Sequence, residues 1–471
     1  MVLQVFNTMS GVEEEFKPIS GNRVNIFVCG PTVYDYSHIG HARTYVAYDV
    51  IVRYLRFKGY STFYLMNITD VDDKIIERSK ERNTPPLTLS EEYTREFYCD
   101  IAMLNISSIN LFAKASEHIP EMIDQITRLL EGGYAYKVDG DVYFDISKFR
   151  DYGRLSHQNP DELKKHRIEP DPRKRNPGDF SLWKSRSRDE LGWESPWGWG
   201  RPGWHIEDTA ITETYFGPQY DIHGGAIELV FPHHEAEIAQ AESVSSKRPM
   251  VKYWIHTGMV NVRGQKMSKS LGNFVTIRDV LRKYSPNVLR FFFISSHYRS
   301  PIDYSEANLE NAHESLRRVV KAHAEAASAL RDARSAEDRN DLEFSKVTAE
   351  SRRRFMEAMD DDFNTPVALS VMLSFSRRLE AYAHLRPAKR TLQEGLSVLR
   401  DFASILGIDL SEARVEQPEI TDALIELIVE LRDEARKRRD WATADKIRER
   451  LASLKISLED EPEGTRWQMK V

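Results

Sequence analysis

Cysteine is nearly absent from this chain of 471 residues, which contains only Cys29 and Cys99. Two cysteines argue against a disulfide framework and favour a reducing compartment, so we expect a cytoplasmic protein. We expect Cys99 to be buried and inert, as a lone cysteine usually is. Long apolar runs are also missing: no stretch approaches the roughly 18 consecutive apolar residues of a membrane-spanning helix. The first residues lack a basic segment followed by an apolar core, so we expect no secretory signal.

An excess of positive charge is missing as well, since the net charge is −7 at pH 7. A protein that binds nucleic acid needs a basic surface somewhere, but not a basic total. Basic stretches occur at 164–167, 173–175, 352–354 and 436–439. Each of them alone is equally typical of a solvated charged face. Internal repeats and low-complexity tracts are absent too, which argues against repeat architectures.

The first part of the chain alternates strand-like and helix-like segments. Residues 24–28 and 62–67 have the apolar pattern of strands, and residues 44–57 have that of a helix between them. This order predicts a parallel βαβ unit, whose ligand site lies at the carboxyl ends of the strands. Cys29 follows the first of these ends. A further strand is predicted at 227–231.

The length favours three or more domains, and the pattern along the chain suggests their bounds. In chain order we expect the first half of an α/β domain at 1–124, an insertion at 125–203, the second half of the α/β domain at 204–262, a Lys/Ser-loop region at 263–310, a helical region at 311–410 and a small final domain at 419–471.

Residues 28–41, Val-Cys-Gly-Pro-Thr-Val-Tyr-Asp-Tyr-Ser-His-Ile-Gly-His, follow the first predicted strand. Gly30 and the proline after it predict a tight turn, and Gly40 lets the backbone approach a ligand closely. His38 and His41 are three residues apart at a predicted helix start, where they can donate to phosphate oxygens beside free backbone N–H groups. Without further context, two packed or capping histidines would explain the same pattern.

A compact Lys/Ser loop, Lys266-Met267-Ser268-Lys269-Ser270, follows much later in the chain. A lysine ammonium on a flexible stem suits a phosphate that moves during a reaction. Together with the two histidines, these lysines predict a site that holds a triphosphate and stabilises charge on its α-phosphate.

His233 and Glu237 lie four residues apart, directly after Pro232, which suits the first turn of a helix. This spacing puts an imidazole and a carboxylate side by side on one helix face, which is half of a zinc site. The signal is weak alone, because His and Glu at this spacing are common on helices.

In this order and at this separation, the two loop motifs resemble the signature motifs of class I aminoacyl-tRNA synthetases. The run Cys29-Gly-Pro-Thr-Val-Tyr-Asp narrows the resemblance to the cysteinyl-tRNA synthetase family, and further motifs match in order from Phe6-Asn7-Thr8 to Trp467. The resemblance implies a Rossmann-like parallel-sheet catalytic domain with a connective insertion, a region that contacts the tRNA stem, a helical bundle and a small C-terminal anticodon-binding domain.

We expect this chain to have the activity of the family that it resembles. The resemblance implies a ligase that joins L-cysteine to ATP as cysteinyl-adenylate, releases pyrophosphate, and transfers cysteine to the 3′-terminal ribose of tRNA(Cys). It also implies one Zn2+ per chain, ATP with Mg2+, and a monomer.

The family's site residues transfer onto this chain position by position. The resemblance implies an ATP site made of Gly30, Gly40, His38, His41, Glu228, Lys266 and Lys269, of which the two histidines and the two lysines are catalytic. It implies an amino-acid pocket made of Cys29, Thr69, Trp204 and His233. The chain departs from the family at Ala226, where the family has Gly, and at Glu228, where it has Asp. Glu228 keeps an acceptor for a ribose hydroxyl, one methylene further out.

A larger departure affects the metal. The family holds zinc with two cysteines, a histidine and a glutamate, and Cys29, His233 and Glu237 match three of these. The fourth is Asp208, where the family has a second cysteine after Trp-His-Ile-Glu. Aspartate carries the charge of a thiolate and is a legitimate zinc ligand, but it is harder than sulfur. We hypothesise that Asp208 ligates zinc; the alternative is that it faces away and leaves the site weak or empty.

A zinc ion in this site would help to select cysteine over serine. Serine differs from cysteine only by oxygen for sulfur, and an apolar pocket discriminates such isosteres poorly. Zinc prefers a thiolate to a neutral hydroxyl, which would select cysteine without an editing site.

The C-terminal segment resembles the family's anticodon-binding domain. Trp441, Asp445 and Arg448 fall on one face of a predicted helix. An aromatic ring can stack on an unpaired base, an aspartate can accept from a base amine, and an arginine can donate to two acceptors. We expect anticodon contacts from these three and from Arg436 and Asp460. The alternative is a helix that packs on its neighbour through Trp441.

Three other functions remain open from the sequence. A related enzyme that joins cysteine to a small amine would lack the anticodon domain, which 419–471 supplies here. A paralogue that activates another amino acid is permitted by Asp208. A non-catalytic tRNA-binding protein is disfavoured, because His38, His41, Lys266 and Lys269 are all present.

Overall fold

The computed structural model describes residues 2–157, 171–267, 272–411, 418–454, 456–461 and 464–469. It divides into two compact units, Met1–Leu410 and Ser411–Val471. In the described part of the chain no helix is both long and apolar enough to cross a bilayer.

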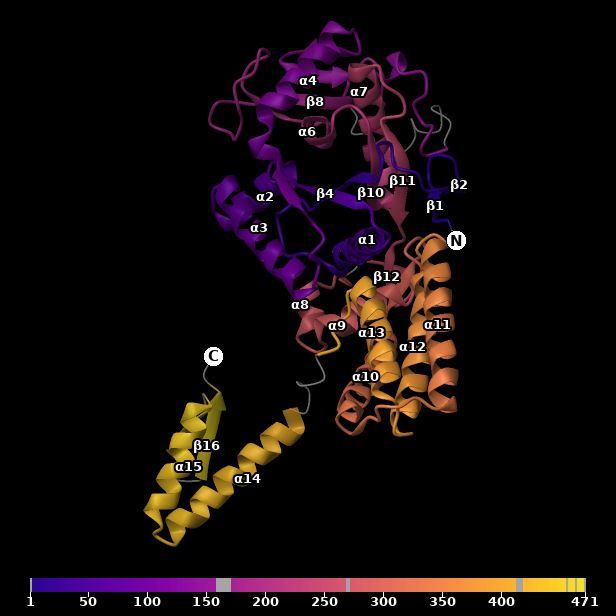
Figure 1. Ribbon diagram of the computed structural model, residues 1–471. Coiled ribbons are helices and arrows are strands. Elements are labelled where there is room, and N and C mark those ends of the chain that lie inside the picture. The colour runs from indigo at the N-terminus through magenta and orange to yellow at the C-terminus, as the bar shows by residue number, and fades with distance from the viewer. Residues whose placement is uncertain are drawn as a thin grey trace. The chain divides into compact units, whose positions relative to one another are not determined.

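A five-stranded parallel sheet is the centre of the first unit (Figure 1). Its order is β11-β10-β3-β4-β5, with strands β3 (Arg23–Val28), β4 (Ser61–Ile68), β5 (Leu111–Lys114), β10 (Tyr220–Ala226) and β11 (Val251–Thr257). The chain runs outward from β3 in one direction through β4 to β5, and in the other through β10 to β11. The strand order therefore reverses between β3 and β10, which is where open α/β sheets bind ligands. The predicted α/β class is confirmed.

Helix α1 (Ile39–Phe57) connects β3 to β4 and buries most of its length against the sheet. The helix predicted at 44–57 lies within α1, and the helix start predicted at His38 and His41 is confirmed, with His38 as the N-cap. The His38 side chain accepts from the backbone N–H groups of Gly40 and His41, and the His41 side chain accepts in return from the N–H of His38. These bonds satisfy donors that a helix start otherwise leaves without partners.

A second layer of structure covers the carboxyl side of the sheet, at the top of Figure 1. It contains the antiparallel sheet β6-β7-β8-β9 and helices α4, α6 and α7. The bounds are α4 (Ile119–Glu131), β6 (Ala135–Val138), β7 (Asp141–Phe144), β8 (Phe180–Ser185), β9 (Gly200–Pro202), α6 (Ile206–Phe216) and α7 (Glu235–Ser245). Trp183 and Trp254 are fully buried in the core that this layer shares with the central sheet.

The predicted strand at 227–231 is wrong. The strand of this region is β10, seven residues earlier, and the chain then makes two short irregular turns, η3 (Ile227–Leu229) and η4 (Val230–His234). Apolar side chains alone did not distinguish a strand from turns that pack against a core.

Smaller elements complete the part of the first unit that precedes the four long helices described below. They are β1 (Gln4–Asn7), β2 (Val12–Glu15), α2 (Asp73–Arg82), α3 (Pro86–Met103), η1 (Ala115–Glu117), η2 (Ile146–Lys148), β12 (Val260–Val262), β13 (Gln265–Lys266), α8 (Ile277–Leu281), α9 (Pro286–Ile294) and β14 (Ile302–Tyr304). Strands β13, β12 and β14 form a small sheet that carries the start of the Lys/Ser loop.

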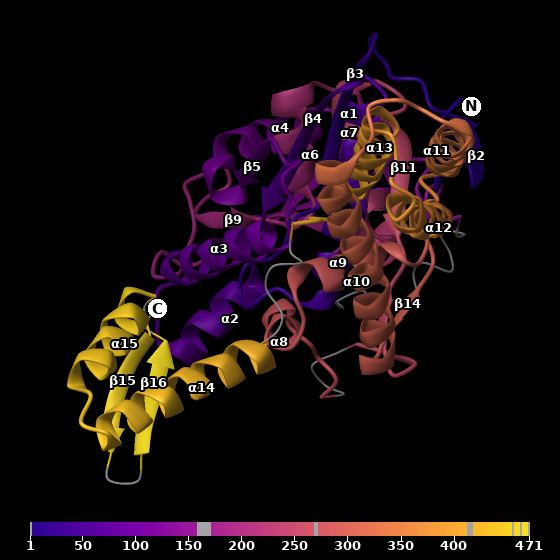
Figure 2. The ribbon, with the colours of Figure 1, turned by 60° about the horizontal axis from the view of Figure 1, so that its bottom comes forward.

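Four long helices follow, and they lie side by side in Figure 1 and Figure 2. They are α10 (Glu306–Ala329), α11 (Arg339–Asp360), α12 (Thr365–Ala383) and α13 (Lys389–Leu406), with η5 (Leu330–Asp332) after the first. The second unit contains α14 (Pro418–Lys437), α15 (Trp441–Ser453) and the hairpin of β15 (Ile456–Glu461) and β16 (Gly464–Met469). Its own small core includes Ile425, Val429 and Leu451.

Cys99 is exposed on α3, so the expectation that it is buried is wrong. Burial statistics for cysteine describe an average, and position 99 lies on the solvent side of an amphipathic helix.

A buried ion pair joins α1 to α9. The Asp49 carboxylate contacts the Arg290 guanidinium, and both side chains are at most 1% exposed. Arg290 also donates to the carbonyl of Leu406, 2.8 Å away at the end of α13. Gly407 follows with a φ of +69°, and a Cβ there would lie 2.1 Å from an Arg290 nitrogen. Burial alone would raise the pKa of Asp49, but Arg290 and Arg53 outweigh it and hold the pKa below its usual range.

We expect Asp49→Ala to lower the free energy of unfolding by about 3–5 kcal/mol, because Arg290 would keep its buried charge without a partner. The measurement is the urea midpoint followed by circular dichroism. Glu343→Ala is the control, since Glu343 pairs with Arg339 on the open surface and should leave the midpoint unchanged. Equal midpoints for both variants would contradict this account.

Candidate active site

The turn after β3 lies at the point where the strand order reverses. The Cys29 N–H donates to the carbonyl of Gly224 on β10, and the Gly30 N–H donates to the Asn67 side chain on β4, 2.6 Å away. A Cβ on Gly30 would lie 1.7 Å from the Asn67 carbonyl oxygen. Only glycine therefore fits this turn in its present place, wedged between the two neighbouring strands.

The two loop motifs, far apart in sequence, lie side by side in the structure. The Ile39 N–H donates to the carbonyl of Val275, and the Ile277 N–H donates to the carbonyl of Ser37. His38 itself forms a β-bridge with Thr276. These backbone contacts hold residues 275–277, which follow the Lys/Ser loop, against the start of α1. The two parts of the predicted triphosphate site are therefore neighbours in the fold.

His38 and His41 stack, with ring centroids 3.7 Å apart. Burial lowers the pKa of His41, and the neighbouring His38 ring lowers it further, so the ring is neutral at pH 7. His38 Nδ1 accepts from backbone N–H groups, which leaves the proton of the neutral ring on Nε2, where it can be donated. A Cβ on Gly40 would lie 2.9 Å from the His38 ring, so Gly40 keeps this face clear.

Lys266 forms an ion pair with Glu228, and the two charged atoms are 2.8 Å apart. Both side chains are about half exposed, so water screens the pair and exchange for another anion is inexpensive. Lys269, the second predicted lysine, lies outside the described residues.

Four potential metal ligands converge beside the Gly30 turn. Cys29 follows β3, Asp208 lies in the first turn of α6, His233 is in η4, and Glu237 is in the first turn of α7. Their ligand atoms all lie within 4.8 Å of one another, and all four residues are buried. Asp208 Oδ2 is 3.4 Å from Cys29 Sγ and 2.9 Å from His233 Nε2, so the Asp208 side chain faces the cluster and not away from it.

These side chains fit a metal cation better than they fit one another. Asp208 Oδ1 is buried without a hydrogen-bond partner among the described residues, and neither oxygen of Glu237 receives a hydrogen bond there. Burial raises the pKa of the Cys29 thiol, and the carboxylates of Asp208 and Glu237 raise it further. Buried acids that repel one another are stabilised by a cation, and one sulfur, one nitrogen and two carboxylates suit four-coordinate zinc.

Two further histidines border the same cluster, and the sequence analysis missed both. His234 Nε2 lies 3.1 Å from Cys29 Sγ, and His223 Nε2 lies 3.2 Å from Glu237 Oε2. With Cys29 and Glu237 they form a second set of four ligand atoms within 4.8 Å. The signal was present, since His234 follows His233 directly, but only the pairing of β10 with β3 places His223 beside Cys29.

Trp204 and Thr69 border this cluster from two elements. The Trp204 indole stacks on the His233 imidazole, with centroids 4.1 Å apart and an angle of 11° between planes, and 41% of the tryptophan is exposed. Thr69 follows β4 and is buried, and its hydroxyl donates to the carboxylate of Glu207. Glu207 is a further acidic residue that the sequence analysis did not select.

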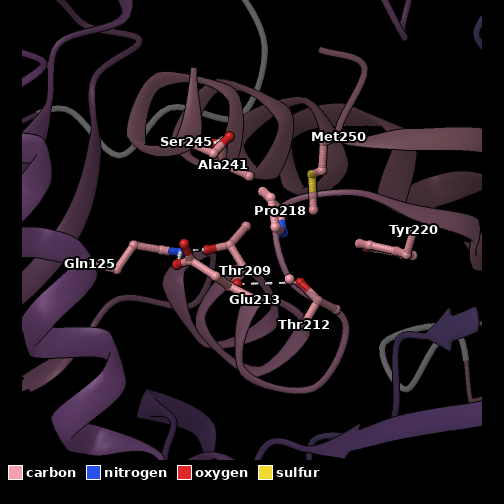
Figure 3. Close-up of a pocket in the computed structure, with 10 residues that line it drawn as sticks. Gln125, Thr209, Thr212, Glu213, Pro218, Tyr220, Ala241, Ser245 and Met250 are labelled. Atoms are coloured by element: carbon pink, nitrogen blue, oxygen red, sulfur yellow. Dashed lines mark hydrogen bonds between the residues drawn. The ribbon is translucent and has the colours of Figure 1, made fainter. Parts of the chain in front are cut away.

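Helix α6 is held in place by a polar network on its next turns, shown in Figure 3. The Thr209 hydroxyl donates to the Gln125 side chain at 2.6 Å, and Gln125 donates to Glu213 at 2.9 Å. These residues line a small cavity whose lining shares no residue with the ligand cluster. The network therefore fixes the helix that carries Asp208, and its residues are not part of the ligand cluster.

In the second unit, Trp441, Asp445 and Arg448 are all exposed on α15. Trp441 is 57% exposed, and Ala444 and Leu451 are the buried residues of this helix. The alternative in which α15 packs through Trp441 therefore does not hold. Arg436 is half-buried in the last turn of α14, and the side chain of Asp460 lies outside the described ones.

Known proteins share this architecture. Two family models match the chain: "tRNA synthetases class I (C) catalytic domain" over residues 15–314, and "DALR domain" over residues 354–411. Among solved structures, methionyl-tRNA synthetase of Mycobacterium tuberculosis in complex with methionyl-adenylate has a TM-score of 0.60 at 16% identity and covers 86% of this chain and 94% of its own. A leucyl-tRNA synthetase (LeuRS) ternary complex of Agrobacterium radiobacter K84 has a TM-score of 0.63 at 12% identity, covering 84% and 86%. These structures show the fold alone, and with the catalytic-domain match they define the chain as a class I aminoacyl-tRNA synthetase.

Full-length relatives narrow the class. The curated cysteine–tRNA ligases of Thermococcus onnurineus and Pyrococcus horikoshii are 45% and 46% identical to it over 472 residues, with 99% of both chains covered. That of Geobacter metallireducens is 47% identical over 496 residues, with both chains fully covered. The chain belongs to the cysteine–tRNA ligase family, which confirms the resemblance drawn from its motifs.

The Gly30 turn provides a test of the site. We expect Gly30→Ala to reduce metal content and to slow cysteine-dependent ATP–pyrophosphate exchange on the order of 10²-fold, because a displaced turn moves Cys29 away from its partners. Elemental analysis and the exchange assay measure the two effects. Glu343→Ala is again the control, since Glu343 pairs with Arg339 on the open surface. A wild-type rate in Gly30→Ala would show that the turn relaxes without moving the site.

Proposed function

We propose that the chain activates L-cysteine with ATP, releases pyrophosphate, and transfers cysteine from cysteinyl-adenylate to the 3′-terminal ribose of tRNA(Cys). The observation that carries this proposal is the sulfur-, nitrogen- and oxygen-bearing cluster at the point where the strand order reverses, beside the paired loop motifs. The first supports a thiol-binding metal, and the second supports a bound nucleotide, at one end of one sheet.

The ATP site of this proposal consists of Gly30, Gly40, His38, His41, Glu228, Lys266 and Lys269, with Mg2+ on the triphosphate. A carboxylate oxygen of cysteine attacks the α-phosphorus, and the bond from that phosphorus to the bridging oxygen breaks as pyrophosphate leaves. The neutral His38 and His41 donate hydrogen bonds to the phosphate oxygens, and the lysines supply positive charge. Lys266 reaches the phosphates by leaving Glu228, whose carboxylate then accepts from a ribose hydroxyl.

The metal site of this proposal consists of Cys29, Asp208, His233 and Glu237, and the metal is zinc. Zinc bound there favours the thiolate of cysteine over the hydroxyl of serine. Asp208 supplies the charge of the thiolate that it replaces, and its contacts with Cys29 and His233 support this role. Cys29, Thr69, Trp204 and His233 border the amino-acid pocket.

The remaining parts of the proposal concern the partner and the surroundings. The α/β halves at 1–124 and 204–262 carry the chemistry; 125–203 is connective, and 263–310 contacts the tRNA stem. The bundle at 311–410 supports them, and 419–471 binds the anticodon through Arg436, Trp441, Asp445, Arg448 and Asp460. The exposed free Cys99 supports a reducing cytoplasm. We propose a monomer, as the family resemblance implies.

Two alternatives differ in testable ways. A ligase for a small amine does not need the second unit, which is present with its own core. A paralogue with altered amino-acid specificity would keep the ATP site and lose the preference for cysteine.

Zinc analysis combined with pyrophosphate exchange tests the proposal. We expect about one zinc per chain in the wild type, loss of zinc in Asp208→Ala, and a strong preference for cysteine over serine. Asp208→Cys is the matched variant, since it restores the family's ligand: its cobalt form should show roughly twice the thiolate charge-transfer absorption of the wild type, because two thiolates replace one. Absence of zinc, together with equal activation of serine, would overturn the proposed substrate; zinc with unchanged content in Asp208→Ala would overturn Asp208 as ligand.

Exposure of Trp441 provides the test for tRNA binding. We expect Trp441→Ala to raise the KM for tRNA(Cys) about 10-fold, because one base loses its stacking partner. Pyrophosphate exchange in the absence of tRNA should stay at the wild-type rate. Glu449→Ala, an exposed change on the same helix, should alter neither quantity. An unchanged KM in Trp441→Ala would remove this face of α15 from the tRNA interface.

A further inference from the structure

Glu207 is a buried carboxylate without a cationic partner. It is 2% exposed, and its one hydrogen bond within the described residues comes from the hydroxyl of Thr69. No lysine or arginine of those residues forms an ion pair with it. A charge in such surroundings is costly unless something positive arrives.

Other buried carboxylates of the same unit have their partners in place. Asp49 contacts Arg290, and the Glu242 carboxylate lies 3.4 Å from Arg154. Glu235, which has no cation, accepts the backbone N–H of Ser156 at 3.0 Å. Asp208 and Glu237 belong to the proposed metal site. Glu207 is different from all of these, because a single hydroxyl is its support.

The location of Glu207 connects it to the amino-acid pocket. Thr69, its partner, also accepts from the Asn67 side chain at 3.3 Å, and Asn67 accepts from the N–H of Gly30. The pair therefore lies against the turn that carries Cys29. Asp208, the next residue of α6, faces Cys29. A ligand sulfur at the cluster would thus have the Thr69 hydroxyl and the Glu207 carboxylate as near neighbours.

We infer that Glu207 recognises the α-ammonium group of the substrate cysteine, with Thr69 as its positioning partner. Only Cβ and Cα separate the thiol of cysteine from its ammonium group, so a sulfur held beside Cys29 leaves the ammonium close to α6. The ammonium has three donors and the carboxylate has only acceptors. Because Thr69 donates its own proton to Glu207 and accepts from Asn67, one lone pair of its oxygen is left to accept from the same ammonium group.

Glu207 would therefore provide a second criterion for substrate selection, in addition to that of the metal. The metal selects a thiol, whereas Glu207 selects an amine on the adjacent carbon. A thiol that lacks the amine would leave the carboxylate buried and unpaired, which a site of this kind rejects strongly.

The inference rests on the proposed function, so the experiment begins with cysteine-dependent pyrophosphate exchange by the zinc-loaded wild type. Two competitors of cysteine then separate the groups of the substrate. Cysteamine has the thiol and the amine without a carboxylate, and 3-mercaptopropionate has the thiol and the carboxylate without an amine. The inhibition constant of each is measured for the wild type and for Glu207→Gln, with zinc content checked in both.

We expect Glu207→Gln to raise both the inhibition constant of cysteamine and the KM for cysteine on the order of 10²-fold, since a buried charge pair is lost. The inhibition constant of 3-mercaptopropionate should stay the same or fall. Thr214→Val is the control on the same helix, because Thr214 is exposed and its hydroxyl donates to the carbonyl of Ala210, so this change should leave all constants unchanged. Thr69→Val keeps the shape of the side chain. It should raise the inhibition constant of cysteamine more than that of 3-mercaptopropionate.

The inference would be overturned if Glu207→Gln and Thr69→Val raised the inhibition constants of both competitors equally. Such a result would mean that the two residues stabilise the fold or the metal site and do not bind the ammonium group. If Glu207→Gln does not fold, the Thr69→Val comparison alone decides in the same way. A wild-type enzyme that does not activate cysteine would instead overturn the proposed function, which is a separate result.

Discussion

Burial of acidic groups at the carboxyl end of the central sheet is the constraint on which the site depends. Cys29, Asp208 and Glu237 are buried and place their ligand atoms within 4.8 Å of one another, and burial raises the pKa of Cys29 and Glu237. Such a cluster is unfavourable in isolation. Under the proposed function, a divalent cation bound by these groups would offset this cost.

The fold brings the cluster and the nucleotide motifs to one place through backbone contacts. The segment 275–277 pairs with residues 37–39, and Gly30 is wedged against β4. The Asp49–Arg290 pair joins α1 to α9 and reaches the end of the last bundle helix. The same pair therefore connects the bundle to the helix whose first turn carries His38 and His41.

The sequence was most informative where a chemical role depends on neighbours in the chain. The Gly30 turn and the His38–His41 pair are local, and so is the spacing of His233 and Glu237, which are 2.9 Å apart in the structure. Prediction was poorer where tertiary packing decides. Residues 227–231 are turns and not a strand, and Cys99 is exposed. His234 was missed although it follows His233 directly, and His223 and Glu207 were missed because nothing in their local sequence separates them from ordinary buried polar residues.

The sequence by itself determined the class of fold, the family, and three members of the candidate metal set, because these follow from short motifs and from hydrophobic periodicity. Only the tertiary structure decided the orientation of Asp208. A residue next to a helix start can face the solvent or the core, and the packing of α6 against α4 and α7 turns this one toward Cys29 and His233. The partnership of Thr69 with Glu207 likewise joins positions 138 residues apart. Contacts at such separation arise from the way the chain folds back on its sheet, and a single sequence does not contain that information in any local pattern.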